Sequence, residues 1–203
     1  MLAALVVLLA IPPSVAAQTG GATGAAPAVV PISNLSFRVG SRTWSEDILD
    51  DIFDSQTSFA VLWDSRKAPS GFGWEAGAFF SSEDASASDG ILSASIDQTL
   101  FELMVGGRYT QQLGTSEFFV FGSAGLDFAF SFVDAEISDG VTTLSEDDND
   151  TSVGAYLGAG GYFKLSERAG LGVDVRKTLG TEDDNLEEDI DYAEVAVSLL
   201  LSF

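Results

Sequence analysis

Apolar residues recur at every second position along the last part of the chain, residues 192–203. This apolar series is Val195, Val197, Leu199, Leu201 and Phe203, and the positions between carry mostly small or polar residues, with Leu200 as the exception. Successive side chains of a strand point to opposite faces, so the alternation predicts a strand with one apolar side. A transmembrane β-strand needs about 9 to 11 residues and one lipid-facing side. We therefore expect this segment to cross a membrane, with the apolar series facing lipid and Glu194 and Ser198 facing a lumen.

The same kind of pattern predicts eight strands in all. They cover residues 35–44, 57–64, 72–81, 99–111, 118–132, 152–165, 169–179 and 192–203. The connections between them alternate, with long ones at 45–56, 82–98, 133–151 and 180–191 and short ones at 65–71, 112–117 and 166–168. An even strand number with alternating long and short connections is typical of outer-membrane barrels. The predicted fold is all-β, an eight-stranded antiparallel up-and-down transmembrane β-barrel.

Charge divides along the same boundaries. The four long connections hold 23 of the 31 acidic residues and no Lys or Arg, while the strands and short turns hold all nine basic residues. The net charge of −22 therefore gathers at one end of the barrel. We expect acidic loops outside the cell, with Arg66, Lys67 and Arg168 marking the opposite rim.

Charged residues inside the strands fall on the face opposite the apolar one. This set contains four arginines and five carboxylates, namely Arg38, Arg42, Glu75, Glu102, Arg108, Asp127, Asp174, Arg176 and Glu194. The interior of an eight-stranded barrel is just wide enough for side chains to fill, and buried charges must be paired. The near balance predicts a plugged lumen with a salt-bridged charge network, in which strand adjacency suggests the pair Arg38 and Glu194. A narrow channel for small solutes is the alternative.

Residues 1–17 read as a signal peptide. They form an almost uncharged apolar run that ends in Pro12, Pro13 and a small-residue exit, the layout of a cleavable export signal. Residues 18–34 are rich in Gly, Ala, Thr and Pro and predict a flexible lead-in. The barrel domain is expected over 35–203.

Composition narrows the chemistry further. The chain has no cysteine and no histidine, which removes thiolate and imidazole catalysis and zinc sites built on either residue. We expect no enzymatic activity, no catalytic residues and no cofactor, and the acidic exterior argues against nucleic-acid binding. Dense carboxylates in the third long connection are candidate oxygen ligands for divalent cations: Glu146, Asp147, Asp148 and Asp150.

Together these features resemble the small eight-stranded outer-membrane barrels of the OmpA-like, OmpX-like and opacity-protein type. In that family the terminal strand with its final aromatic, here Phe203 with Leu201, Leu199, Val197 and Val195, is similar to the signal read by the barrel-assembly machinery. The resemblance implies a monomer in the outer membrane of a Gram-negative bacterium, with outer-membrane lipid and the assembly machinery as partners. It implies a role in envelope integrity, adhesion or surface recognition. A secreted lipocalin-like soluble barrel that binds an apolar ligand is a further alternative.

Overall fold

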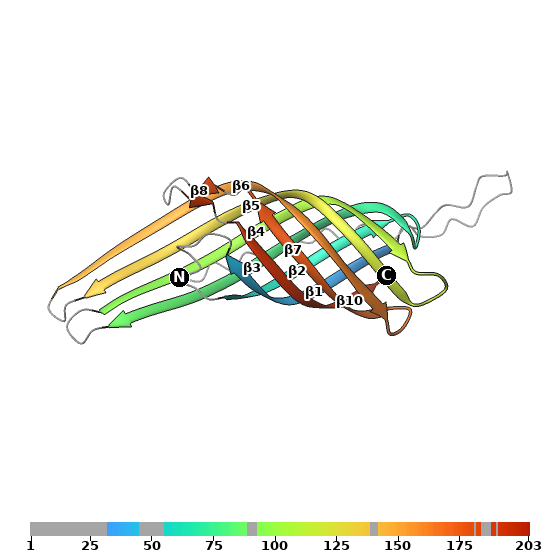
Figure 1. The fold of residues 1–203 in the computed structure, drawn as a ribbon, viewed down its shortest axis with the longest axis horizontal. Coiled ribbons are helices and arrows are strands. Elements are labelled where there is room, and N and C mark those ends of the chain that lie inside the picture. The colour runs from blue at the N-terminus through green and yellow to red at the C-terminus, as the bar shows by residue number, and fades with distance from the viewer. Residues whose placement is uncertain are drawn as a thin grey trace, which may run out of the picture.

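The computed structural model describes residues 32–44, 55–88, 93–138, 142–180, 182–183, 188–189 and 191–203, and these form a closed antiparallel barrel (Figure 1). Eight strands close in the order β1-β10-β7-β6-β5-β4-β3-β2. Their bounds are β1 Ile32–Trp44, β2 Gln56–Arg66, β3 Gly71–Ser88, β4 Ser93–Gln112, β5 Phe118–Ser138, β6 Thr143–Lys164, β7 Ala169–Leu179 and β10 Tyr192–Ser202. Two short strands, β8 Glu182–Asp183 and β9 Glu188–Asp189, pair separately. No helix among the described residues is long and apolar enough to span a membrane.

The barrel closes between its first and last strands. Leu35 pairs with Leu201, and Ser33 and Phe203 exchange backbone hydrogen bonds of 3.2 and 3.0 Å. A path through the register that leaves β1 at Ser33 returns to it at Thr43, a stagger of ten residues. Such a stagger tilts the strands by about 35–45° to the barrel axis. Strands of 11 residues, such as β7 and β10, are long enough to cross a membrane at that tilt.

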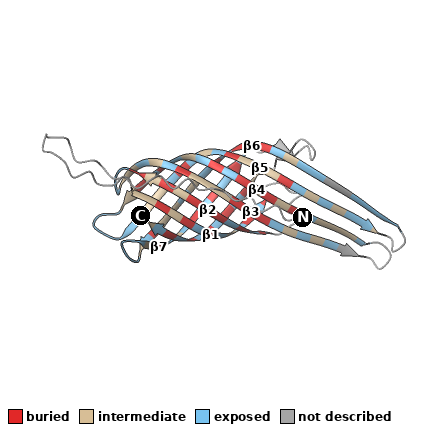
Figure 2. Cartoon of the chain, turned by 180° about the vertical axis from the view of Figure 1, so that it is seen from behind, coloured by how far each residue is buried: buried red, intermediate tan, exposed pale blue. Residues whose placement is uncertain are grey.

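Each strand has one buried and one exposed face, which Figure 2 shows as alternating bands. In β10 the alternation runs without interruption from Tyr192 to Leu201, with Val195 and Val197 57% and 61% exposed while Glu194 is 1% exposed. The exposed face is apolar and the buried face is largely polar, the reverse of a soluble barrel. This arrangement excludes the lipocalin-like alternative, because that fold turns its apolar side inward.

Four neighbouring strands, β3 to β6, continue past the end of the others as a four-stranded sheet (Figure 1). The prediction that 82–98 and 133–151 are long connections is therefore wrong over most of both segments. They form two hairpins, β3–β4 and β5–β6. The hairpins are joined because β4 pairs with β5 from Ser93 and Ser138 towards the barrel. We call this part, 82–88, 93–99, 132–138 and 143–151, the extension. Its alternation persists, but Ser, Ala and Asp replace the large apolar residues that mark a membrane strand.

Two other boundaries also differ from the prediction. β1 begins at Ile32, inside the segment expected to be a lead-in, and β2 continues to Arg66. Residues 1–31 lie outside the described residues, so the signal peptide stays a prediction.

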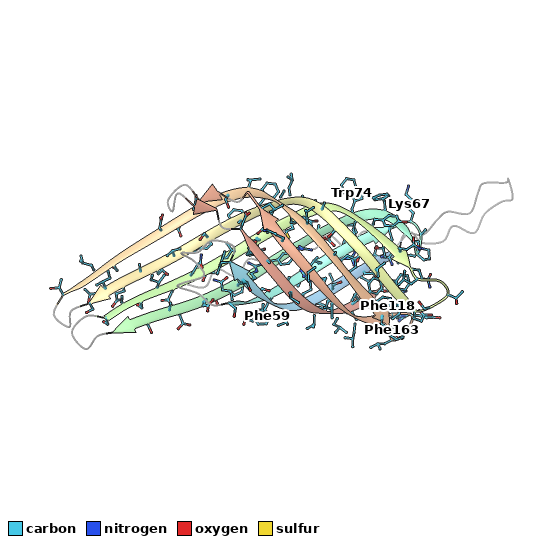
Figure 3. The ribbon with its side chains drawn as sticks, viewed as in Figure 1. Phe59, Lys67, Trp74, Phe118 and Phe163 are labelled. Atoms are coloured by element: carbon cyan, nitrogen blue, oxygen red, sulfur yellow. The ribbon has the colours of Figure 1, made fainter. Side chains whose placement is uncertain are left out.

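Aromatic side chains cover both ends of the outward face. Trp74, Phe118 and Phe163 gather with Lys67 at the short-turn end, and Phe59 lies towards the other end (Figure 3). Phe59 begins a row of directly paired residues that continues through Phe80, Phe101 and Phe130. Paired aromatic zones of this kind are expected where a barrel meets the two membrane interfaces.

Trp44, at the end of β1, lies inside the barrel and not on its outward face. It is 4% exposed and meets the Tyr192 ring edge-on at 6.0 Å. Its inward parity on β1 explains the placement, since Arg38 and Arg42 share the same face.

Candidate functional site

All nine charged residues predicted for the inner face are buried in the lumen. None is more than 7% exposed, and they come from six of the barrel strands, listed here in chain order: Arg38, Arg42, Glu75, Glu102, Arg108, Asp127, Asp174, Arg176 and Glu194. Parity along each strand decides which side chains enter the lumen. The closed sheet then brings residues from opposite walls together.

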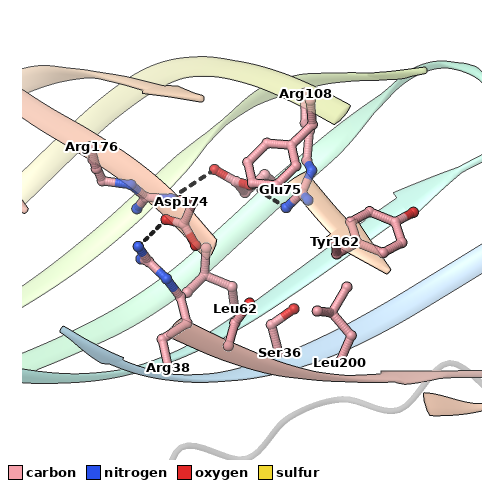
Figure 4. Close-up of a pocket in the computed structure, with 11 residues that line it drawn as sticks. Ser36, Arg38, Leu62, Glu75, Arg108, Tyr162, Asp174, Arg176 and Leu200 are labelled. Atoms are coloured by element: carbon pink, nitrogen blue, oxygen red, sulfur yellow. Dashed lines mark hydrogen bonds and ion pairs between the residues drawn. The ribbon is translucent and has the colours of Figure 1, made fainter. Parts of the chain in front are cut away.

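Glu75 lies at the centre of the network. Its Oε2 atom accepts a hydrogen bond from Arg108 Nη1 at 2.9 Å, and its Oε1 atom accepts one from Arg176 Nη2 at 3.1 Å (Figure 4). The Tyr156 hydroxyl also donates to Oε1, at 3.2 Å. Glu75 is 1% exposed. A carboxylate this deeply buried is stable in its charged form only with such partners.

A second group of charges links β1 to β10, β7 and β4. Arg38 forms an ion pair with Asp174 and lies 3.3 Å from Glu194, the pair suggested by strand adjacency. Arg42 forms an ion pair with Glu102 and donates from Nε to Glu194 at 3.1 Å. Glu194 therefore joins both β1 arginines into one network.

Aromatic rings fill the space between these pairs. The Arg42 guanidinium lies 4.2 Å from the Tyr192 ring centre, and the Tyr192 hydroxyl donates to Glu102 at 2.5 Å. Arg176 stacks at 4.6 Å from both Phe79 and Tyr156. Cation–π contacts of this kind stabilise arginines most where water is excluded.

Two charged residues of the lumen were not predicted. Arg66 Nη1 donates to Asp64 at 2.9 Å and Arg66 Nη2 donates to the Tyr162 hydroxyl at 2.7 Å. Arg66 is 4% exposed, so its predicted place on the exposed rim opposite the acidic loops is wrong. The predicted second strand ended at residue 64, whereas β2 continues to Arg66. Asp64 and Arg66 lie on the inner face because both alternate in step with the other inward residues of β2. Lys67 and Arg168 are exposed in the short turns, as that assignment expects.

Asp127 differs from the other carboxylates of the lumen. It is fully buried beside Glu102, yet it forms no ion pair with any described arginine. Five buried arginines therefore face six buried carboxylates among the described residues. The lumen is close to neutral, with one acidic group in excess.

Little free space remains around the central pairs. A cavity of about 10 Å³ lies between Arg38, Glu75, Arg108, Asp174 and Arg176 (Figure 4). A volume of this size accommodates about one water molecule. Stacked rings of Phe119 and Tyr162, 4.8 Å apart, lie towards the short-turn end.

The extension carries the acidic residues of its two hairpins, β3–β4 and β5–β6. Asp84 pairs with Asp97 and Asp97 with Asp134, so three carboxylates stand side by side across three strands. Like charges directly opposite each other destabilise a sheet in isolation. This row therefore favours the approach of positive charge.

The predicted cation ligands lie on β6 of the extension and not in a loop. Asp148 and Asp150 accept hydrogen bonds from the backbone nitrogens of Asn149 and Thr151 at 2.8 and 2.7 Å. The side chains of Glu146 and Asp147 lie outside the described residues. Within the described part of the chain, no group of three or more carboxylates is arranged to hold a metal ion, so this site stays a prediction.

Comparison with known proteins agrees with this architecture. The family model described as outer membrane protein beta-barrel domain matches residues 1–203. Among solved structures, Ail, the attachment invasion locus protein of Yersinia pestis in complex with the heparin analogue sucrose octasulfate, matches with a TM-score of 0.53 and 10% identity, over 85% of this chain and 97% of that one. Neisserial surface protein A matches with a TM-score of 0.52 and 12% identity, over 85% and 97%.

At these identities the structural matches establish the fold alone. None of the curated proteins compared with the chain matches it significantly. The family match spans the chain, and the inside-out distribution of apolar and charged residues agrees with it. The chain belongs to the outer membrane protein β-barrel family and lies in the outer membrane.

Proposed function

We propose that this protein is a non-enzymatic, monomeric surface-recognition barrel with a closed lumen, whose acidic extension meets partners outside the cell. The observation that carries the proposal is the extension itself. Four strands continue beyond the apolar band as a sheet rich in carboxylates (Figure 1). A barrel needs no such sheet to cross the membrane, because strands such as β7 end without one.

The lumen supports a structural role for the charge network. The paired arginines and carboxylates, the interleaved rings and the cavity of about 10 Å³ leave little space for a solute. The predicted assembly signal, Phe203 with its apolar series, supports the barrel-assembly machinery as a partner during insertion. The chain also lacks His and Cys, the residues most often used for nucleophilic or acid–base catalysis.

Charge indicates the kind of partner. Ail was solved with a polysulfated, strongly anionic ligand, whereas no Lys or Arg occurs between residues 82 and 99 or between 132 and 151 of this chain. An acidic surface attracts basic partners and repels anionic ones. The extension is therefore suited to adhesion to basic surfaces.

A variant without the extension tests the proposal. Residues 83–98 and 133–148 are each replaced by a two-residue Asn-Gly turn, which leaves the paired residues 82 and 99 and 132 and 149 beside the new turns. Cells displaying the variant or the full chain are then applied to surfaces coated with polylysine or heparin. Heat-dependent gel mobility confirms that both barrels are folded. We expect the full chain to increase adherence to polylysine only, and the shortened barrel to lose this increase. Equal adherence by the folded shortened barrel would refute the proposal.

A further inference from the structure

The two faces of the extension differ sharply in chemistry. Polar and apolar residues alternate along the β3, β4 and β5 parts of the extension, which is the pattern of a sheet with one solvated and one covered face. The β6 part differs, because it is polar from Ser145 to Thr151. The face continuous with the outside of the barrel is polar throughout its outer rows; we call it the acidic face, formed by Asp84, Ser86, Ser95, Asp97, Asp134, Glu136 and Ser145. The face continuous with the lumen carries Glu83, Gln98, Val133 and Asp148 in the row nearer the barrel. Its outer rows contain the apolar residues Ala85, Ala94, Ile96, Ala135, Ile137 and Leu144, and we call this outer part the apolar face.

The apolar face is contiguous in the register. Ala94 pairs with Ile137 and Ile137 with Leu144 in one row, and Ala85 pairs with Ile96 and Ile96 with Ala135 in the next. Nearest the barrel, Ala85 and Ile96 pack against the buried Trp44 and Tyr192 cluster. That end of the face is covered by the barrel's own residues.

The outer end of the face remains open. Ile137 is 53% exposed and Leu144 is 72% exposed, although they lie beyond the apolar band that faces lipid. Figure 2 shows the outer strands in pale blue and tan, without the buried bands of the barrel wall. Exposed apolar residues that adjoin one another in an ordered sheet mark an interaction surface more often than isolated ones do.

Carboxylates border this open area on the same face. Asp148 is exposed on β6, and Asp150 follows it on the same side of the strand. Because neither hairpin contains Lys or Arg, no positive charge of the extension competes for these groups. A partner that covers the apolar face therefore needs aliphatic groups and adjacent positive charge.

We propose that the apolar face of the extension is a docking site for a cationic amphipathic polypeptide segment. The inference rests on the proposed recognition function and specifies its site and partner. The aliphatic side of the segment covers Ala135, Ile137 and Leu144, and its basic side chains meet Asp148 and Asp150. Alanines at the other positions leave the face shallow, so an extended backbone approaches the sheet closely. The like charge of the extension disfavours a second copy of the chain in this place.

The test uses the full-length barrel in nanodiscs of zwitterionic lipid and two synthetic peptides. One peptide alternates Leu and Lys; the other alternates Ser and Lys, with the same length and charge. We expect the first to bind more tightly. In the double variant Ile137→Ser with Leu144→Ser, affinity for the Leu/Lys peptide should fall by about tenfold or more, because the burial of two aliphatic side chains is lost. Binding of the Ser/Lys peptide should be unchanged.

A matched variant on the opposite face separates docking from general attraction. Asp84→Asn with Asp134→Asn removes two charges from the acidic face of the same strands, and we expect the preference for the Leu/Lys peptide over the Ser/Lys peptide to persist. Asp148→Asn should weaken both peptides. The inference is overturned if the Ile137/Leu144 variant binds the Leu/Lys peptide as the full chain does, or if the acidic-face variant abolishes that preference. Dimers of the full chain that the Ile137/Leu144 variant abolishes would assign the face to a second copy.

The two experiments distinguish failure of this docking site from failure of the proposed recognition function. Loss of adherence on removing the extension, together with an unaffected Ile137/Leu144 variant, would leave recognition intact and refute only this docking site. Far-UV circular dichroism and heat-dependent gel mobility confirm that each variant is folded. Both substituted positions are exposed near the hairpin ends, so the barrel wall should be undisturbed.

Discussion

At the scale of single residues, the lumen depends on glycines that make room for one ring. A Cβ atom on Gly106 would clash first with the Ala124 backbone carbonyl oxygen on β5, and it would lie 2.5 Å from the Tyr156 hydroxyl. We predict that Gly106→Ala displaces Tyr156 and destabilises the barrel by about 1–3 kcal/mol. Gly107→Ala is the control, because its added methyl meets nothing within 4 Å. Urea unfolding of the reconstituted protein, followed by gel mobility, measures both. Equal stability would show that both the β5 backbone at Ala124 and the Tyr156 ring give way to the added methyl group.

The central carboxylate gives a second prediction at this scale. Glu75→Gln leaves Arg108 and Arg176 without the charge that both contact, and unpaired buried charges are costly. We expect the free energy of unfolding to fall by about 3–5 kcal/mol. Glu117→Gln, at an exposed position in a short turn, should have almost no effect. If the two variants unfold alike, water or ions compensate the arginines.

At the scale of elements, the outward face of β7 is apolar in its middle and carries one lysine near its outer end. Val173 is 55% exposed in the middle of the strand, while Lys177 lies on the same face nearer its outer end. A lysine at the bilayer midplane costs about 2–4 kcal/mol and one near the interface about 0–1 kcal/mol. We predict that Val173→Lys destabilises the barrel by the larger amount and Leu179→Lys by the smaller, in denaturant titrations in liposomes. The same cost at both positions would contradict the proposed depth of the strand.

Alternation predicted the strands that cross the membrane because their outward residues are large and apolar. It assigned inner and outer faces from parity alone, as β10 illustrates between Tyr192 and Leu201. The extension was assigned to loops because its outward positions are Asp and Ser, whose charge suggested solvated connections. Pairing with a neighbouring strand, which composition does not encode, keeps those residues in the sheet.

Partner choice in the lumen was less predictable than burial. Arg38 on β1 meets Asp174 on β7 although β10 lies between the two strands. Such a contact depends on the length of the arginine side chain across a narrow lumen, and not on strand adjacency. Arg66 was missed for a simpler reason, since its strand continues past the predicted end at residue 64.

At the scale of the whole molecule, charge is separated into a nearly neutral lumen and an acidic outer end. A formal charge of −22 on the chain would suggest a cation pathway if it lined the interior. Instead the inner wall pairs Arg42 with Glu102 and Arg108 with Glu75. The carboxylates of Asp84, Asp97 and Asp134 lie outside this lumen, side by side on the extension.

This separation predicts that the barrel does not conduct. In planar bilayers, the purified protein should show no steady conductance, because the central cavity of about 10 Å³ holds about one water molecule between the paired charges. Arg108→Ser with Glu75→Ser removes a pair without changing the net charge and enlarges this cavity. We expect brief openings from that variant only. Steady conductance of the unmodified barrel that changes with Arg108→Ser alone would instead support the narrow solute channel, since ions would then pass the residue that the closed lumen makes inaccessible.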